Sequence, residues 1–228
     1  PILAKGAVRF VGDPVALIVA ETRTQAQDAA ELVMVDYDIL PAVTDTASAL
    51  DAGAPLVWPE RGSNLCVHWS SGREQQAEEA FAQAARTVTV NLVNNRLVGN
   101  PMEPRVAIGE YDAAADRFTL HSPTQGVVRV QEGLAKFIFN IPKDRLRVIS
   151  PDVGGGFGLR GKLFPESAMV LWAAKRLGRP VKWRADRTET FLCDPHGRDH
   201  VTEAEMAFDT DAKILGMRCA PSRRWGPI

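Results

Sequence analysis

The segment with the clearest chemical potential is a run of glycines around one aromatic residue, residues 154–158, which read GGGFG. Four residues without a Cβ in five positions let the main chain approach a ligand closely and turn its N–H groups toward an acceptor. A helix predicted to begin at Pro165 would add the positive end of its dipole to an anion site. A tight turn without a ligand is the alternative interpretation. Phe157 favours a ligand, because a large aromatic ring serves no turn but can form a wall against a planar molecule.

Two common phosphate-binding patterns come close to this glycine run. Residues 156–163 read GFGLRGKL and nearly fit the spacing G-x-x-x-x-G-K-[ST]. Leu163 replaces the hydroxyl residue that would bind magnesium, which disfavours ATP hydrolysis. Counted from Gly154 and Gly156, the dinucleotide pattern G-x-G-x-x-G has Leu159 in place of its third glycine. A P-loop-like nucleotide-binding module stays an alternative, as does a non-catalytic assembly fragment.

Side chains that could bind a metal are scattered along the chain. Three cysteines far apart in sequence, Cys66, Cys193 and Cys219, form no CxxC pair, so neither a disulfide framework nor a zinc or iron–sulfur site is indicated. His196 and His200 have i, i+4 spacing, but the proline and glycine beside His196 indicate a loop, and no acidic ligand is placed to complete a site. We expect no protein ligand to a metal. Any redox centre must then come from a bound cofactor or another subunit.

The charge of the chain is balanced, with 27 Lys and Arg against 28 Asp and Glu in 228 residues, a formal net charge of −1. No sequence-wide basic field exists to hold nucleic acid or an anionic membrane surface. No apolar run approaches the roughly 18 residues that a spanning helix needs. We expect a soluble, cytoplasmic protein without a nucleic-acid partner.

The elements that would position the glycine run follow from hydrophobic periodicity. Helices are predicted over 24–34 with Thr22 or Thr24 as N-cap, 74–85, 125–139 and 165–177. Strands are predicted over 15–20, 35–40, 87–92 (half-buried), 105–111, 117–121, 145–149, 181–185, 201–208 and 213–217. The order around the glycines is therefore strand, loop, helix, strand.

These elements predict an α+β or mixed α/β fold. Residues 1–45 form a β-α-β unit that is too small to be a whole domain, so the start looks cut from a longer chain. Residues 46–72 are rich in Pro, Gly, Ser and Asp and form a connector. Residues 73–228 form the larger part, in which the tail 218–228 is atypical. A shifted reading frame would explain this tail, and chance is the alternative.

Three stretches carry a resemblance to a known family. Residues 122–191 resemble the first molybdopterin-binding domain of the molybdenum hydroxylases, which are the xanthine dehydrogenase, aldehyde oxidase and carbon monoxide dehydrogenase large subunits. Residues 8–43 resemble the later part of the small α/β hammerhead domain that precedes it, and residues 100–112 (NPMEPRVAIGEYD) resemble the beginning of the cofactor domain. PMEPR and VGGGFG look closest to the carbon monoxide dehydrogenase type. The resemblance implies a segment of a large subunit that is incomplete at both ends.

The resemblance also implies residue roles. Gln125, in the family's TQ motif, would lie beside molybdenum and hydrogen-bond an oxo ligand, a task that suits a neutral amide. Gly155, Gly156, Phe157 and Gly158 would lie against the pterin. Arg160 would pair with a cofactor or substrate anion, with a solvated surface arginine as the alternative.

Two acidic positions bear on substrate and mechanism. Xanthine-oxidising relatives place a glutamate where this chain has Gly161, which leaves aldehydes, carbon monoxide or N-heterocycles as substrates. Glu103, in the motif MEPR, is interpreted as a strand-start residue whose carboxylate pairs with a nearby arginine, and not as a general base. The family's glutamate base lies beyond this segment, so we expect the chain alone to be inactive and to bind its cofactor weakly or not at all.

The resemblance implies the remaining parts of the enzyme. The reaction would be oxidative hydroxylation with water as the oxygen source, carried by molybdopterin, as the cytosine dinucleotide, with molybdenum. Partners would be the remainder of the large subunit, an iron–sulfur small subunit and an FAD-binding medium subunit.

Overall fold

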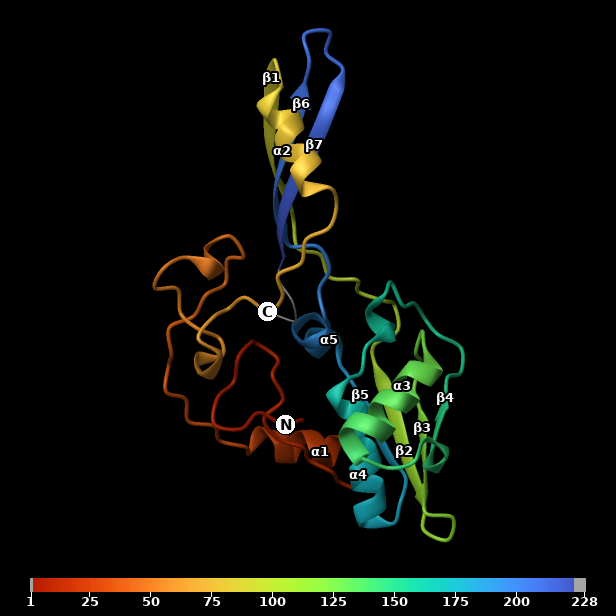
Figure 1. Cartoon of the computed structure of the whole chain (residues 1–228). Coiled ribbons are helices and arrows are strands. Elements are labelled where there is room, and N and C mark those ends of the chain that lie inside the picture. Colours follow the sequence, from red (N-terminus) through yellow and green to blue (C-terminus); the bar gives the residue numbers. More distant parts are fainter. Residues whose placement is uncertain (1, 224–228) are drawn as a thin grey trace. The chain divides into compact units, whose positions relative to one another are not determined.

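The computed structural model describes residues 2–223, which cluster into two compact units. The first unit comprises residues 2–38 and 98–195, and the second comprises residues 39–97 and 196–223. Figure 1 shows the element order. The extents 1–45, 46–72 and 73–228 that were predicted as domains stay predictions. The mixed α/β fold class is confirmed.

A four-stranded sheet forms the centre of the first unit, in the order β4-β3-β2-β5. Its strands are β2 (Val106–Asp112), β3 (Arg117–His121), β4 (Leu146–Ile149) and β5 (Val181–Arg184). β2 and β3 form the predicted antiparallel hairpin, β5 pairs antiparallel with β2, and β4 pairs parallel with β3.

Three helices of this unit follow the sheet strands in the chain. They are α3 (Val127–Gly133), continued by a π-helical turn over Leu134–Phe139, α4 (Pro165–Leu177) and α5 (Arg187–Cys193). α4 begins and ends where predicted, with Pro165 in its first turn and Gly178 in the left-handed conformation that ends a helix.

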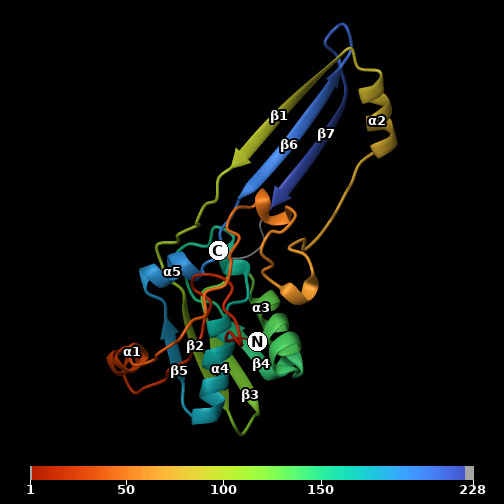
Figure 2. The same cartoon turned by 90° about the vertical axis from the view of Figure 1, so that its left-hand side faces the viewer.

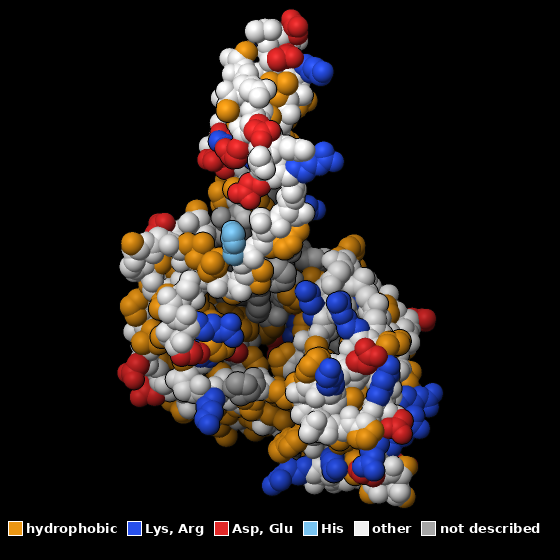
Figure 3. Space-filling view, viewed as in Figure 1, with side chains coloured by type: hydrophobic (Ala, Val, Ile, Leu, Met, Phe, Trp, Pro, Cys, Tyr) orange, Lys and Arg blue, Asp and Glu red, His pale blue; other side chains and the backbone are white. Residues whose placement is uncertain are grey.

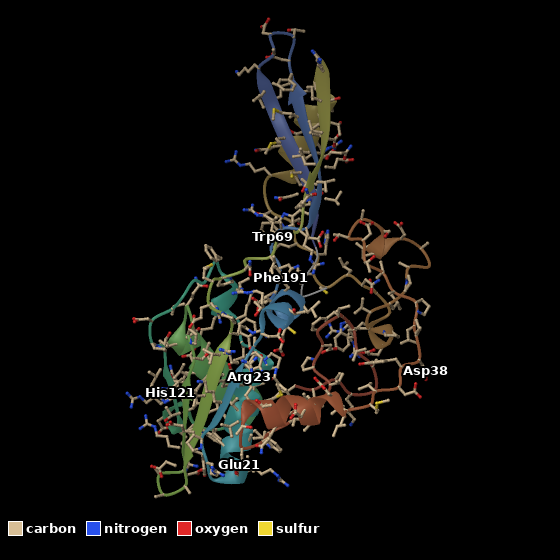
Figure 4. All side chains as sticks on the ribbon, turned by 180° about the vertical axis from the view of Figure 1, so that it is seen from behind. Glu21, Arg23, Asp38, Trp69, His121 and Phe191 are labelled. Carbon is tan, nitrogen blue, oxygen red and sulfur yellow. The ribbon has the colours of Figure 1, made fainter. Side chains whose placement is uncertain are left out.

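The core of the first unit lies between the sheet and the helices. Buried side chains of β2, β3, β4, α3 and α4 form one cluster, with Leu120, Leu134, Leu146 and Leu171 fully buried. Gly109 in β2 allows α4 to approach, because a Cβ there would lie 2.5 Å from the carbonyl carbon of Val170. The alternating positions of β2 and β3 are mostly partly exposed and mix apolar with polar side chains, and Nε2 of His121, labelled in Figure 4, lies 3.5 Å from Oε2 of Glu110. The sheet therefore buries one face fully and the other in part.

The β-α-β prediction for the beginning of the chain is only partly correct. Helix α1 (Arg23–Glu31) forms, and Thr22 caps it in a capping box with Gln25. Residues 15–20 and 35–40 pair with no strand in the part of the chain that the structure describes. An apolar segment becomes a strand only when a neighbour completes its ladder of hydrogen bonds, and the apolar pattern alone does not show whether that neighbour exists.

The second unit is built on an antiparallel sheet, β1-β6-β7, with α2 (Glu74–Ala82) packed on β7 (Figure 2). The strands are β1 (Arg86–Asn94), β6 (His200–Phe208) and β7 (Ile214–Arg223). Acidic and basic side chains are interspersed on the visible face of this sheet and helix (Figure 3). A half-buried β1 was predicted, but every residue of β1 is exposed. β7 continues beyond Met217 to Arg223, so part of the atypical tail is regular strand, and residues 224–228 lie outside the described residues.

Candidate functional site

Three segments of the first unit meet around the glycine run, namely residues 99–105, 122–126 and 150–162. Gln125 lies directly beside the glycines, where its Oε1 accepts the Gly158 N–H at 3.0 Å. A Cβ on Gly156 would lie only 2.4 Å from the Gln125 Cδ. The Gln125 N–H in turn donates to the Arg160 carbonyl at 3.2 Å. The structure thus brings the predicted glutamine and the predicted loop together, while their roles stay predictions.

The conformation of the loop explains its glycines. Gly155 and Gly158 have φ values of +109° and +86°, in the region that favours glycine. A Cβ on Gly155 would also lie 3.1 Å from the Pro101 Cβ. Phe157 has a φ of +49°, unusual for a bulky residue, and is 75% exposed. Its ring is therefore free to lie against a ligand.

The N–H groups of the loop divide into bonded and free ones. The Gly154 N–H donates to Glu103, the Gly158 N–H to Gln125 and the Leu159 N–H to the Gly156 carbonyl. Within residues 2–223, the N–H groups of residues 155–157 have no acceptor. Three consecutive donors are thus available between two fixed points, which suits an anionic or oxygen-rich ligand.

Arg160 is buried rather than solvated, with 3% of its surface exposed, so the surface alternative is wrong. Its guanidinium donates to the Glu103 carbonyl and lies 3.9 Å from the Glu103 carboxylate. Burial lowers the pKa of Arg160, although an arginine stays protonated. The predicted pairing of Glu103 with a nearby arginine is confirmed.

Sequence reasoning missed two residues that hold this site. The Glu103 carboxylate accepts the Gly154 N–H at 3.0 Å, and its own N–H donates to the Gly154 carbonyl at 3.1 Å. Arg187, at the start of α5, donates to the Asn100 side chain at 2.7 Å and to the carbonyls of Pro101 and Met102 at 2.8 and 2.7 Å. No local pattern indicates such contacts, because the partners lie 51 or more residues apart.

A buried cluster of charged side chains surrounds Arg105, two residues beyond Glu103. The Arg105 Nε lies 2.5 Å from Glu166, its Nη1 contacts Asp194, and its guanidinium lies 4.5 Å from the centre of the Phe164 ring. Burial raises the pKa of Glu166, against the opposing effect of Arg105. Desolvation of the buried carboxylate accounts for that direction, and the repulsion from the nearby Asp194 adds to it.

The other candidates carry no site. His196 accepts a hydrogen bond from Arg96 at 2.8 Å, and the three cysteines are free. No group of three His, Cys, Asp or Glu residues that could hold a metal ion occurs in residues 2–223. Within the same residues, no helix combines the length and apolar character needed to cross a membrane.

The nucleotide alternative fits the geometry poorly. Counted from Gly156, the dinucleotide spacing is in fact met by Gly158 and Gly161. Only a short 3-10 turn (Leu159–Gly161) follows, however, and α4 begins later, at Pro165. Both nucleotide patterns need a helix that starts directly at the loop.

Comparison with known proteins gives matches over both halves of the chain. The model of the molybdopterin cofactor-binding domain matches residues 57–227. The model of the aldehyde oxidase and xanthine dehydrogenase a/b hammerhead domain matches residues 1–41.

Individual relatives agree with these models. The chain is 36% identical to the 6-hydroxypseudooxynicotine dehydrogenase complex subunit gamma of Paenarthrobacter nicotinovorans, over 96% of this chain and 27% of that protein. It is 32% identical to the carbon monoxide dehydrogenase large chain of Hydrogenophaga pseudoflava, over 95% of this chain and 28% of that protein. The chain therefore spans about a quarter of the length of the curated relatives it matches.

Solved structures show the same fold. Quinoline 2-oxidoreductase from Pseudomonas putida 86 superposes with a TM-score of 0.88 at 37% identity, over 97% of this chain and 28% of that one. Carbon monoxide dehydrogenase from Oligotropha carboxidovorans superposes with a TM-score of 0.89 at 30% identity, over 96% of this chain and 29% of that one. Because the cofactor-domain model covers well over half of the sequence, the chain belongs to the molybdopterin-binding large subunits of the molybdenum hydroxylases, of which it is a segment.

Proposed function

We propose that residues 99–162 form one wall of the molybdenum cofactor site of an oxidoreductase that hydroxylates its substrate with water as the oxygen source. The observation that carries this proposal is the row of three free N–H groups, at residues 155–157, beside the Gln125 amide. When bound, the molybdenum cofactor would supply the two-electron oxidation, which no side chain of this site can perform.

The residues present fit a flat, oxygen-rich and sulfur-rich group. Because Gly155 and Gly156 have no Cβ, Pro101 and the Gln125 amide pack directly against the main chain of the loop, which brings Gln125 beside the three N–H groups. Phe157 offers an exposed ring for stacking. Arg160 holds the loop through its hydrogen bond to the Glu103 carbonyl. Its proposed role is therefore to fix the loop and not to contact an anion directly.

Gln125 is oriented for donation. Because its Oε1 accepts the Gly158 N–H, the amide is fixed with Nε2 as the remaining polar atom. A hydrogen of Nε2 can then donate to an oxygen on the bound group without adding charge to the site. We therefore propose that Gln125 orients the bound group by hydrogen bonding and does not transfer a proton.

The finer parts of the proposal come from the family. We propose molybdopterin cytosine dinucleotide as the cofactor form, iron–sulfur and FAD-binding subunits as partners together with the remainder of a large subunit, and the cytoplasm as the location. Relatives named for nicotine and quinoline support N-heterocycles as the substrate class, with carbon monoxide and aldehydes as alternatives. Gly161 supports the exclusion of xanthine-type recognition, because it has no side chain where those relatives have a glutamate.

The chain alone is proposed to be inactive. The carboxylate that contacts the loop, Glu103, accepts the Gly154 N–H and faces Arg160 through its Oε2, and we assign it to supporting the loop and not to the general base. Metal analysis of the purified chain that shows stoichiometric molybdenum, together with dye reduction by quinoline, would contradict this.

Binding can be tested on the chain itself. The ¹⁵N–¹H NMR signals of the glycine amides are followed while molybdopterin is added without oxygen. Of the two outcomes expected for the chain alone, weak binding and none, the three available N–H groups favour weak binding, so we expect small, saturable shifts for Gly155, Gly156 and Gly158, and weaker binding in Gln125→Ala. Unchanged glycine signals in the wild-type chain would refute the proposed site.

A further inference from the structure

Glu103 contacts both ends of the glycine loop. Its carboxylate accepts the Gly154 N–H at 3.0 Å, and its N–H donates to the Gly154 carbonyl at 3.1 Å. Its carbonyl accepts a hydrogen bond from Arg160, which ends the same loop. One residue thus binds the first and last positions of residues 154–160 through three separate groups.

The segment that carries Glu103 is itself held in place. Arg187 binds the carbonyls of Pro101 and Met102, and Pro101 is fully buried. Close packing also constrains the contact, because a Cβ on Gly154 would lie 2.5 Å from the Glu103 Cβ. Glu103 therefore contacts the loop from a rigid position.

We infer that Glu103 is a positioning residue for the proposed cofactor site. By holding Gly154 and Arg160 together, it keeps the loop in the conformation that leaves the three N–H groups of residues 155–157 free. The inference rests on the proposed function for the identity of the ligand that these N–H groups bind. The effect of Glu103 on the conformation of the loop is a property of the chain without ligand. Sequence reasoning placed Glu103 in a pair with an arginine and gave it no part in the site.

Two substitutions of Glu103 distinguish a positioning role from a general structural role. Glu103→Gln keeps an oxygen that can accept the Gly154 N–H, whereas Glu103→Ala removes it. A hydrogen bond to a charged acceptor is worth more than a neutral one. We therefore expect Glu103→Gln to restore part, but not all, of what Glu103→Ala loses.

The experiment measures amide hydrogen exchange and molybdopterin binding by NMR in the full chain. In Glu103→Ala we expect exchange at Gly154 and Gly158 to become about tenfold faster and molybdopterin binding about tenfold weaker. In Glu103→Gln both values should lie between those of Glu103→Ala and those of the wild type. Glu110→Gln, at a partly exposed position of β2, is the matched control and should change neither. If Glu103→Ala does not fold, Glu103→Asp, which keeps the charge but shortens the reach, takes its place.

The outcomes are distinguishable. Unchanged exchange in Glu103→Ala overturns the inference, and so does a Glu103→Gln variant that is as impaired as Glu103→Ala. Faster exchange with unaltered molybdopterin binding also overturns it, while the proposed function stands. Failure of the wild-type chain to bind molybdopterin refutes the proposed function itself, whatever the exchange data show.

Discussion

A methyl group at Gly156 should displace the Gln125 amide. A Cβ at this position would lie 2.4 Å from the Gln125 Cδ, 2.7 Å from Oε1 and 2.8 Å from Nε2. Non-bonded carbon atoms settle at about 3.5–4.0 Å, so a shift of about 1 Å or more is required. Gln125 is an exposed side chain and Gly156 has no left-handed φ, so the amide moves and the main chain does not.

The expected magnitudes follow from the hydrogen bond that is lost. A displacement of this size breaks the 3.0 Å contact between Oε1 and the Gly158 N–H. A neutral hydrogen bond contributes about 1 kcal/mol, so the free energy of unfolding should fall by about that amount. Molybdopterin affinity should fall by about tenfold, because the same movement takes Nε2 away from the ligand. Urea unfolding and NMR titration measure the two quantities.

Gly161→Ala is the matched control for Gly156→Ala. It lies in the same loop, has an ordinary φ and has no neighbour within 4 Å of the added Cβ. In a Gln125→Ala background, Gly156→Ala should have no further effect on binding, because the side chain it displaces is gone. Equal affinities of Gly156→Ala and Gly161→Ala, or additive effects with Gln125→Ala, would refute the assigned role of Gln125.

Two further predictions concern stability. Gly109→Ala should lower the free energy of unfolding, measured in urea, by about 3 kcal/mol, because its Cβ would lie 2.5 Å from the main chain of Val170. A decrease as small as that of Gly161→Ala would contradict the packing of α4 against β2. Burial raises the pKa of Glu166 in the folded chain. As the pH rises above 4.5, the unfolded chain releases this proton first, so the free energy of unfolding falls between the pKa of the unfolded chain and that of the folded chain. Glu166→Gln should lack this contribution, so its stability relative to wild type should rise with pH. A difference independent of pH would contradict a raised pKa, because it would mean that Glu166 has the same pKa in the folded and unfolded chains.

The parts of the fold that could be predicted from the sequence are those with local signals. The bounds of α4 follow from Pro165 and Gly178, and the β2–β3 hairpin follows from two alternating segments with a short polar link. Residues 15–20 and 35–40 had the apolar composition of strands but no partner among the described residues. Periodicity specifies what a segment can become, while pairing depends on residues elsewhere in the chain.

The candidate site, too, could be predicted from the sequence only in part. The glycine run was visible as composition, but its contact with Gln125 joins residues 33 positions apart and was expected only through the family resemblance. Glu103 and Arg187 were missed because each acts on main-chain groups of a distant loop. Any residue type has such groups, so the sequence of the loop carries no sign of its partners.

Arginine is well suited to hold irregular segments of this kind. A loop without regular secondary structure leaves carbonyl groups that need donors, and a guanidinium supplies several donors in one fixed plane. Arg187 binds two carbonyls of the segment before Glu103, and Arg160 binds the carbonyl of Glu103 itself. The arginines thus fix residues 101–103, and within the glycine loop the carbonyls of Gly154 and Gly156 accept the N–H groups of Glu103 and Leu159, so the N–H groups of residues 155–157 are not used in these bonds. The loop can then be rigid and still present three donors to a ligand, a combination that a helix or a strand interior, whose N–H groups are used internally, does not provide.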